Sequence, residues 1–297
     1  LNLRDVGAEF EKVRAKYEGE RVSVHIIGFA KAIADIADGA SQVLVFFIGA
    51  FVITAVLLYW YCRSAMLTAW TLVAATIPVI WLLGLLPLMG LGLDPLSILV
   101  PFLIFAIGVS HAVQMTNAWK LETLHGADGI TASTHSFQKL FIPGAMALLA
   151  NALGFMVIAV VDIEIVRELA FTATVGVTVM IITNKVLLPI LLSYMRISAA
   201  SAQKLRGKET AGDWLWTRLG FLATRRGALL PIAVSVLLAA GAVWEVRHLL
   251  IGDASKGVPE LRAESRYNRD VDMITSHFAI GVDLLQVVAE MKGDSSP

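Results

Sequence analysis

The chain has few charged residues and a single cysteine. Asp, Glu, Lys and Arg make up only 16% of its 297 residues, whereas hydrophobic residues make up 57%, and the mean hydropathy is +0.73. A water-soluble domain of this length carries more charge, so a soluble fold is excluded and a lipid bilayer is the expected solvent. The formal net charge of zero gives no reason to expect a nucleic-acid partner. Cys62 alone cannot form an internal disulfide or a cysteine-based zinc site.

Motifs of enzyme sites are also missing. The sequence has no glycine-rich phosphate loop, no zinc cluster and no nucleophile beside a base, and His25, His248 and His277 are too dispersed to indicate a site. We therefore expect no enzymatic activity, no cofactor and no bound metal. The chain begins at Leu1 and lacks a signal-peptide pattern, which is typical of a fragment of a larger polypeptide.

Long apolar stretches recur along the chain. A helix needs about 20 apolar residues to cross roughly 30 Å of hydrocarbon, and every backbone amide there must be paired within the protein. Six stretches meet this requirement: 43–61, 65–89, 96–118, 140–161, 169–195 and 228–246. The sequence therefore predicts an all-α polytopic membrane bundle, with a five-helix block at 43–195 and a sixth helix at 228–246.

The distribution of Lys and Arg predicts the orientation of this bundle. The loops after the first, third and fifth spans hold ten Lys and Arg residues, whereas those after the second and fourth hold only Arg167. Basic loops stay on the inner side of a membrane. We therefore expect an integral protein of the plasma or inner membrane, with both ends of the chain outside.

The segments outside the spans predict further elements. Residues 1–42 and 247–297 are interpreted as pieces of two incomplete α/β domains on the outer side. Their expected strands are 22–28 and 283–290, and their expected helices are 29–42 and 265–277. On the inner side, linker 196–227 carries apolar residues at helical spacing in 212–224, which indicates either an amphipathic helix on the membrane surface or a polar linker.

Polar residues on the third span form the first candidate site. Ser110, His111, Gln114 and Asn117 share a face about 120° wide at 100° per residue. An ionisable group inside a span costs about 2.5–3.5 kcal/mol to insert, so His111 is a candidate functional group. It could carry protons near neutral pH. Alternatively, a neutral His111 acts with Gln114 as hydrogen-bonding contacts between helices.

Lys185 is the other ionisable residue within a span, and Asn184 precedes it. Lys185 lies roughly 16 Å of helix from the basic inner end at Arg196. Either its side chain snorkels toward the inner headgroups, or it lines an internal polar site with His111. In the second case their like charges oppose each other. Our candidates for a proton relay or coupling site are Ser110, His111, Gln114, Asn117, Asn184 and Lys185.

The run Phe-Ala-Ile-Gly-Val-Ser-His-Ala-Val-Gln at 105–114 resembles the fourth-helix motif of the resistance-nodulation-division superfamily. The similar branch includes the mycobacterial large membrane proteins (MMPL) and Patched-type sterol-sensing proteins. The order of elements is similar too, with the second outer domain opening at 259–270. The resemblance implies that the chain covers family helices two to seven, that 43–195 is the sterol-sensing block, and that the flanks belong to porter-type domains.

The same resemblance implies export of hydrophobic or lipid-like compounds driven by the proton-motive force. Its expected partners are membrane lipids, a hydrophobic or lipid substrate, protons and possibly further copies of the chain. Ser110 and His111 occupy the positions where the family places its proton-carrying Asp and the residue after it. On the resemblance, His111 could carry the proton instead. Two alternatives stay open: a sterol- or lipid-sensing module without transport, and a membrane scaffold subunit of a lipid-processing complex.

Overall fold

The computed structural model describes residues 3–94, 96–195, 213–249 and 257–278, and its chain divides into two compact units. One unit contains residues 43–249 and the other contains 1–42 with 250–297. Six helical segments are long and apolar enough to cross a membrane, which confirms the predicted number of spans. They are Phe29–Cys62, Ala65–Leu88, Ser97–Leu124, Gly129–Ile158, Glu164–Ser193 and Leu229–His248.

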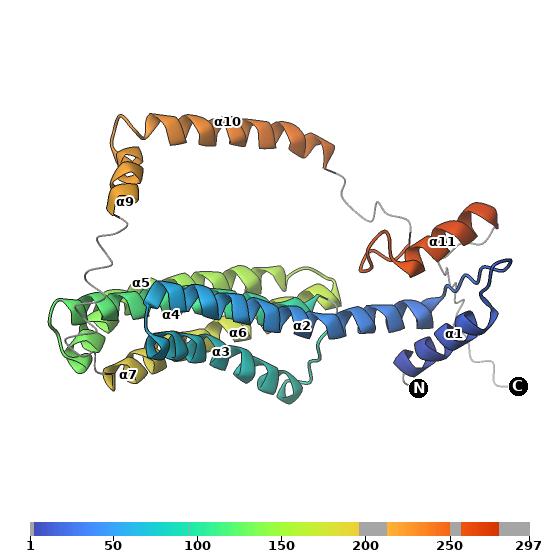
Figure 1. Ribbon diagram of the computed structural model, residues 1–297, viewed down its shortest axis with the longest axis horizontal. Coiled ribbons are helices and arrows are strands. Elements are labelled where there is room, and N and C mark those ends of the chain that lie inside the picture. The colour runs from blue at the N-terminus through green and yellow to red at the C-terminus, as the bar shows by residue number, and fades with distance from the viewer. Residues whose placement is uncertain (1–2, 95, 196–212, 250–256, 279–297) are drawn as a thin grey trace, which may run out of the picture. The chain divides into compact units, whose positions relative to one another are not determined.

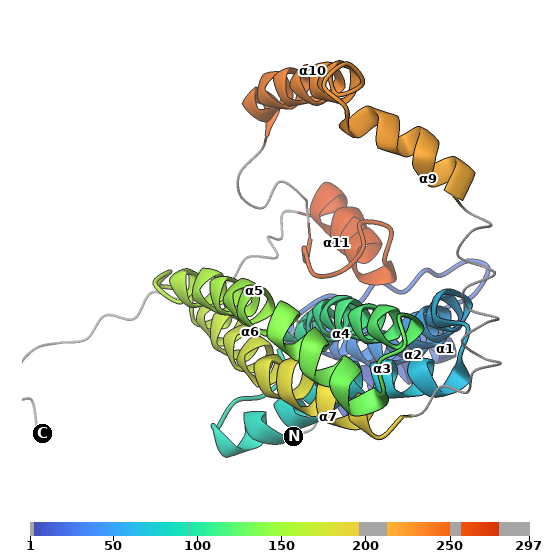
Figure 2. The same ribbon diagram turned by 90° about the vertical axis from the view of Figure 1, so that its left-hand side faces the viewer.

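Helices α3 (Ala65–Leu88), α4 (Val100–Leu124), α5 (Gly129–Ile158), α6 (Glu164–Ile182) and α7 (Leu188–Ser193) form the helical bundle of the larger unit (Figures 1 and 2). Because hydrocarbon surrounds such a bundle, tight packing rather than water exclusion holds its helices together. Small residues make the contacts close. A Cβ atom on Gly108 of α4 would stand 3.2 Å from the carbonyl oxygen of Ala75 in α3, so these two backbones touch.

Helix α5 begins well before the predicted start of the fourth span. The carboxylate of Asp128 accepts a hydrogen bond from the amide of Thr131 at 3.2 Å and caps the helix. Residues 129–139 are polar, so a search for apolar stretches does not assign them to the span. The structure nevertheless buries Ser133 and Ser136 of this segment in the bundle. The first turns of α5 are helical because they are capped and packed, not because they are hydrophobic.

Two spans have little packing against the described helices. Helix α2 (Phe29–Cys62) meets α4 through Phe47, whose ring centroid lies 5.0 Å from that of Phe102 and 5.4 Å from that of Phe105. Helix α10 (Leu229–Glu245) has no buried residue.

Helix α9 (Asp213–Gly220) lies within residues 212–224, where an amphipathic helix was one of the two predictions.

The smaller unit contains α1 (Leu3–Tyr17), the first part of α2 and α11 (Arg266–His277). Helix α11 confirms the helix predicted at 265–277, whereas α1 was not predicted. The strand predicted at 22–28 is wrong, since this segment is extended but joins no sheet. Its backbone bonds to side chains instead, with Arg14 and Arg266 both donating to the Val24 carbonyl. The strand predicted at 283–290 lies outside the described residues, so the α/β domains are not shown.

Asp270 holds the two distant parts of this unit together. Its carboxylate is 1% exposed and accepts hydrogen bonds from Arg14, from the Ile26 amide at 3.1 Å and from Arg266 at 3.3 Å. His25 Nδ1 lies 2.8 Å from the same group. Arg14, His25 and Ile26 precede the first span, and α11 follows the last one. Residues that precede the first span and residues that follow the last one therefore pack together in this unit.

We expect Asp270→Asn to loosen segment 22–28, because removing one partner of a buried ion pair costs about 3–5 kcal/mol. Hydrogen exchange at the Ile26 amide measures the change directly, and its protection should fall about 100-fold or more. Glu264→Gln, which removes an exposed charge beside α11, is the matched control and should leave this protection unchanged. Equal losses in the two variants would contradict the role of Asp270.

Candidate functional site

A π-helical segment, Thr183–Leu187, joins α6 to α7 in the middle of the fifth span region. The wider π turn contains one more residue than an α turn, and such segments in α-helices are frequent at functional sites. Here Thr183, Asn184 and Lys185 are each 0% exposed. Three consecutive polar side chains are therefore buried inside a bundle that crosses a membrane.

The Lys185 side chain packs against Gly144 of α5. A Cβ atom on Gly144 would overlap the Cε and Nζ atoms of Lys185, so a larger residue at this position would force the end of the Lys185 side chain to move. Lys185 Nζ has no hydrogen-bond partner among the described residues. Lys185 therefore does not snorkel to the end of the helix, and its ammonium lies within the bundle.

His111 reaches the same level from α4. Gly108 of α4 lies beside Met180 of α6, and these two helices run in the same direction. Three residues further along each helix, His111 comes level with Thr183 and hence with Lys185. His111 is 8% exposed and close enough to Lys185 for their charges to interact. The structure thus brings together the two ionisable residues that the sequence singled out.

The buried site is rich in unpaired polar atoms. Within the described residues, both amide atoms of Asn184 and Nδ1 of His111 lack a hydrogen-bond partner. Contacts between helices through a hydrogen-bonded His111, one of the two predicted roles, are therefore not observed in the described part of the chain. Buried polar groups are usually hydrogen-bonded, so these atoms mark the site as unusual within the bundle.

The charged groups on the helices around Lys185 lie toward the helix ends. Helices α3 and α7 carry none. Those on α4, α5 and α6 are Lys120, Glu122, His135, Lys139, Glu164, Arg167 and Glu168. No carboxylate at mid-span in the described helices can neutralise Lys185. If His111 and Lys185 were both protonated, two like charges would face each other in a low dielectric, which disfavours the doubly charged state.

The polar stripe predicted on α4 is divided between two environments. His111 is buried, whereas Ser110 and Gln114 are exposed and Asn117 is half-buried. The reason is helical rotation. His111 is about 100° around the helix from Ser110, so His111 lies on the packed face while Ser110 lies outside it. Of the six candidates, the structure groups only His111, Asn184 and Lys185.

Residues 61–205 match the family model for the sterol-sensing domain of SREBP cleavage-activation. The matched stretch contains α3 to α7 and the whole buried site. Comparison with curated proteins gave no match, and neither did comparison with solved structures. The six apolar helices and this similarity support an integral membrane protein with a sterol-sensing-type bundle.

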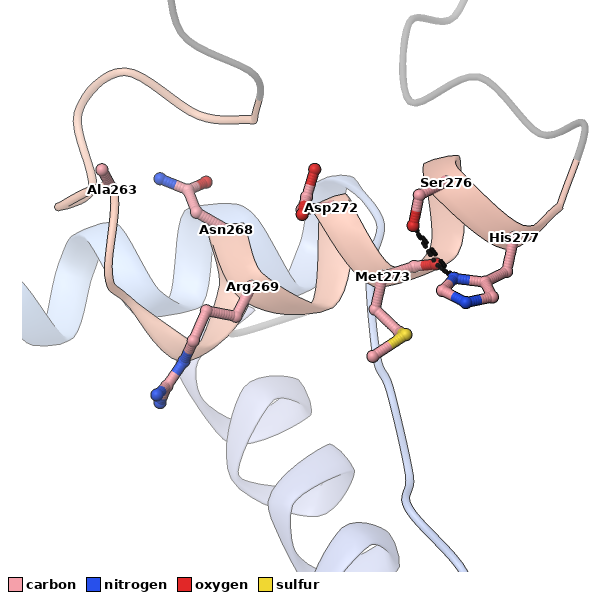
Figure 3. A pocket seen from close by; sticks show the side chains of 7 residues that line it. All are labelled: Ala263, Asn268, Arg269, Asp272, Met273, Ser276 and His277. Carbon is pink, nitrogen blue, oxygen red and sulfur yellow. Dashed lines mark hydrogen bonds between the residues drawn. The ribbon is translucent and has the colours of Figure 1, made fainter.

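A shallow pocket of about 500 Å³ lies on α11, far from these residues in sequence (Figure 3). Asn268, Asp272, Met273 and His277 are among its lining residues. In the described parts of the chain no group of His, Cys, Asp and Glu could hold a metal ion. The pocket is an open surface feature, so the buried residues remain the candidate site.

Sequence reasoning did not find the π segment or the role of Gly144. Glycine within a span is common, and nothing in the sequence shows which side chain faces it. The contact between Gly144 and Lys185 can be recognised only once the packing register of α5 against the fifth span is known.

We expect Gly144→Ala to lower the free energy of unfolding by about 1–3 kcal/mol, because the new methyl group displaces the buried Lys185 side chain. Gly154→Ala on the same helix is the matched control, since a Cβ there meets nothing within 4 Å. In a Lys185→Ala background the penalty of Gly144→Ala should vanish. Denaturant unfolding of the purified protein in micelles measures this cycle, and a penalty that persists without Lys185 would contradict the packing.

Proposed function

We propose that this protein exports hydrophobic or lipid-like molecules and couples that export to proton movement through His111 and Lys185. The observation that carries the proposal is the burial of two ionisable groups at one level of the bundle, with no carboxylate beside them among the residues that the structure describes. Because insertion of each such group is costly, their retention favours a function that uses their charge.

The chemistry of the pair suits proton coupling. Imidazole changes protonation near neutral pH, and a buried lysine without a counter-ion readily gives up its proton. A proton taken up by one group raises the cost of protonating the other. The pair therefore favours one shared proton over two, and the site changes its net charge when that proton arrives or leaves. Such a change in net charge can shift the equilibrium between two arrangements of the surrounding helices.

The role does not require enzymatic chemistry or a cofactor. Substrate would enter from the surrounding lipid, as its hydrophobic character allows. On this proposal Ser110, Gln114 and Asn117 are not part of the proton site, and Asn184 is a buried polar neighbour of Lys185 in the π segment. The orientation predicted from the loops places both flanking segments outside a plasma or inner membrane.

A second candidate function is sterol or lipid sensing without transport. The specific observation that favours it is the sterol-sensing match over residues 61–205. In that case the unpaired polar atoms would respond to a ligand in the bundle, and ligand binding would be indifferent to a proton gradient.

Transport by the full-length protein in proteoliposomes tests the first function. With rhodamine 6G or the fluorescent sterol dehydroergosterol as probe, we expect efflux only when a proton gradient is imposed. His111→Ala and Lys185→Met should each reduce efflux to the level of protein-free vesicles while the protein stays folded. His135→Ala, an exposed histidine on α5, is the control and should transport normally. Normal export by both site variants would contradict the proposal.

Sterol binding separates the second function from the first. A photoreactive cholesterol analogue should label the wild-type protein saturably in the same vesicles. If labelling is equal with and without the gradient and neither probe is exported, sensing replaces export as the function. If labelling changes with the gradient and export occurs, the export proposal stands.

A further inference from the structure

Buried polar side chains are unequally distributed along the bundle. One end, which we call the Gly129 end, contains the end of α4, the start of α5 and the end of the fifth span. Trp119 Nε1 donates a hydrogen bond to the Gly129 carbonyl at 3.1 Å, and a Cβ atom on Gly129 would overlap the Met195 carbonyl oxygen. Lys120 Nζ lies 5.6 Å from the centre of the Tyr61 ring, so α3, which follows Tyr61, also starts at this end.

The half of the bundle between the Gly129 end and His111 contains six buried polar side chains: Thr68, Thr71, Thr116, Lys120, Ser133 and Ser136. The hydroxyls of Thr71 and Thr116 lie 2.9 Å apart and link α3 to α4. At 1.5 Å per residue, Thr116 is about 8 Å from the level of His111 along α4. The hydroxyls of Ser133 and Ser136 have no hydrogen-bond partner among the described residues.

The two serines lie along α5 on the way to Lys185. Helix α5 contacts the fifth span at Gly129 and again at Gly144, where it meets Lys185, and both serines are between these contacts. Along the helix axis, Ser136 is about 12 Å and Ser133 about 16 Å from the level of Gly144. Ser133 is also within about 20° of Gly144 around the helix, so it lies on the same packed face.

The opposite half of the bundle has an apolar core. Along α6, about 16 Å of helix separates Thr183 from the next buried polar side chain, Thr172. Thr174, which is half-buried, donates to the carbonyls of Ala170 and Ala152. Over the same stretch, the described parts of α3, α4 and α5 contribute no buried polar side chain. The core there consists of apolar residues that include Val79, Leu82, Ile104, Phe105, Leu148 and Val177.

Packing alone does not account for the two serines. A hydroxyl in a helix commonly donates to the carbonyl four residues earlier. Thr71 does so to Leu67 at 2.7 Å, and the exposed Thr134 does so to Ile130 at 3.0 Å. Ser133 and Ser136 make no such bond, although both are buried. Their hydroxyls are therefore available to a neighbour inside the bundle.

We propose that water and protons reach His111 and Lys185 from the Gly129 end, along the buried hydroxyls, and that the apolar half closes the pair off from the opposite end. A hydroxyl both donates and accepts hydrogen bonds, so it can pass a proton along a chain of polar atoms and bridging water. The apolar core offers no such partner, and it disfavours the entry of ions.

This inference deepens the proposed function and rests on it, because it assigns the side with which the pair exchanges its proton. The Lys and Arg residues of the loops predict that the Gly129 end is the inner one. In the described arrangement the pair therefore exchanges protons with the inner side. Proton uptake from the outer side requires a second arrangement in which the apolar half opens.

Silver ions test the route without relying on export, because Ag⁺ is small, moves with water and binds thiols. The full-length protein, with Cys62→Ala and no other native cysteine, is reconstituted in vesicles in nitrate buffer. Ser136→Cys should be blocked at least about tenfold faster by Ag⁺ on the Gly129 side than by Ag⁺ on the other side. Ser133→Cys is the second probe. The readout is loss of labelling by a fluorescent maleimide after unfolding.

Two further variants control this experiment. Val177→Cys, which lies in the apolar half and is 0% exposed, should resist Ag⁺ from both sides. His125→Cys, exposed between α4 and α5, reports which way the protein faces through labelling by an impermeant maleimide. Resistance of both serine positions from both sides, equal rates from the two sides, or faster blocking of Val177→Cys would overturn the inference.

Proton movement into vesicles that contain pyranine tests the hydroxyl itself. Ser136→Ala should slow proton-coupled movement about 5-fold, the value of one hydrogen bond, while the protein stays folded, and Ser136→Thr should restore it. Thr134→Ala on the same helix is the matched control and should behave as wild type. A wild-type rate in Ser136→Ala, with no Ag⁺ access at Ser136→Cys, refutes the route alone. The expected Ag⁺ access without any export by the wild type refutes the proposed function alone.

Discussion

The hydrocarbon of a membrane offers no hydrogen bonds, so every polar group inside the bundle must find its partner within the protein. Helices α3 to α7 pair their backbone N–H and C=O groups within each helix, and most of their side chains are apolar. Both properties suit a membrane. His111, Asn184 and Lys185 do not. They are buried with unpaired polar atoms, and the fold accommodates Lys185 by widening one turn and by placing Gly144 opposite it.

The resemblance to proton-driven exporters and the match to the sterol-sensing domain concern the same helices. They differ in what the polar residues are for. The exporter resemblance places proton chemistry on α4, at Ser110 and His111. The structure shifts attention to a pair shared between α4 and the π segment. Ser110 is exposed, whereas His111 is buried and close enough to Lys185 for their charges to interact. His111 and Lys185 are both basic, whereas the exporter resemblance implies a carboxylate at this level of α4.

Much of the architecture could be predicted from the sequence, because long apolar runs are a strong signal that does not depend on neighbours. The number of spans is of this kind, whereas helix α11 is polar and was predicted from its local pattern. The start of α5 was missed, since its first turns are polar and owe their helical form to the cap at Asp128 and to burial of Ser133 and Ser136. The segment 22–28 was taken for a strand because its composition suits one. Its hydrogen bonds instead come from Arg14, Arg266 and Asp270, which are far away in sequence.

The sequence by itself determined that this is a membrane protein and that His111 and Lys185 are its unusual residues, since the cost of an ionisable group in a span depends only on composition and depth. Which polar residues act together was decided by the tertiary structure alone. A turn of 100° separates Ser110 from His111, and the packing of α4 against α6 determines which of them is buried. The register of α5 against the π segment likewise sets Gly144 beside Lys185. The packing register of two helices depends on contacts among several helices, so the sequence pattern of one helix does not predict it.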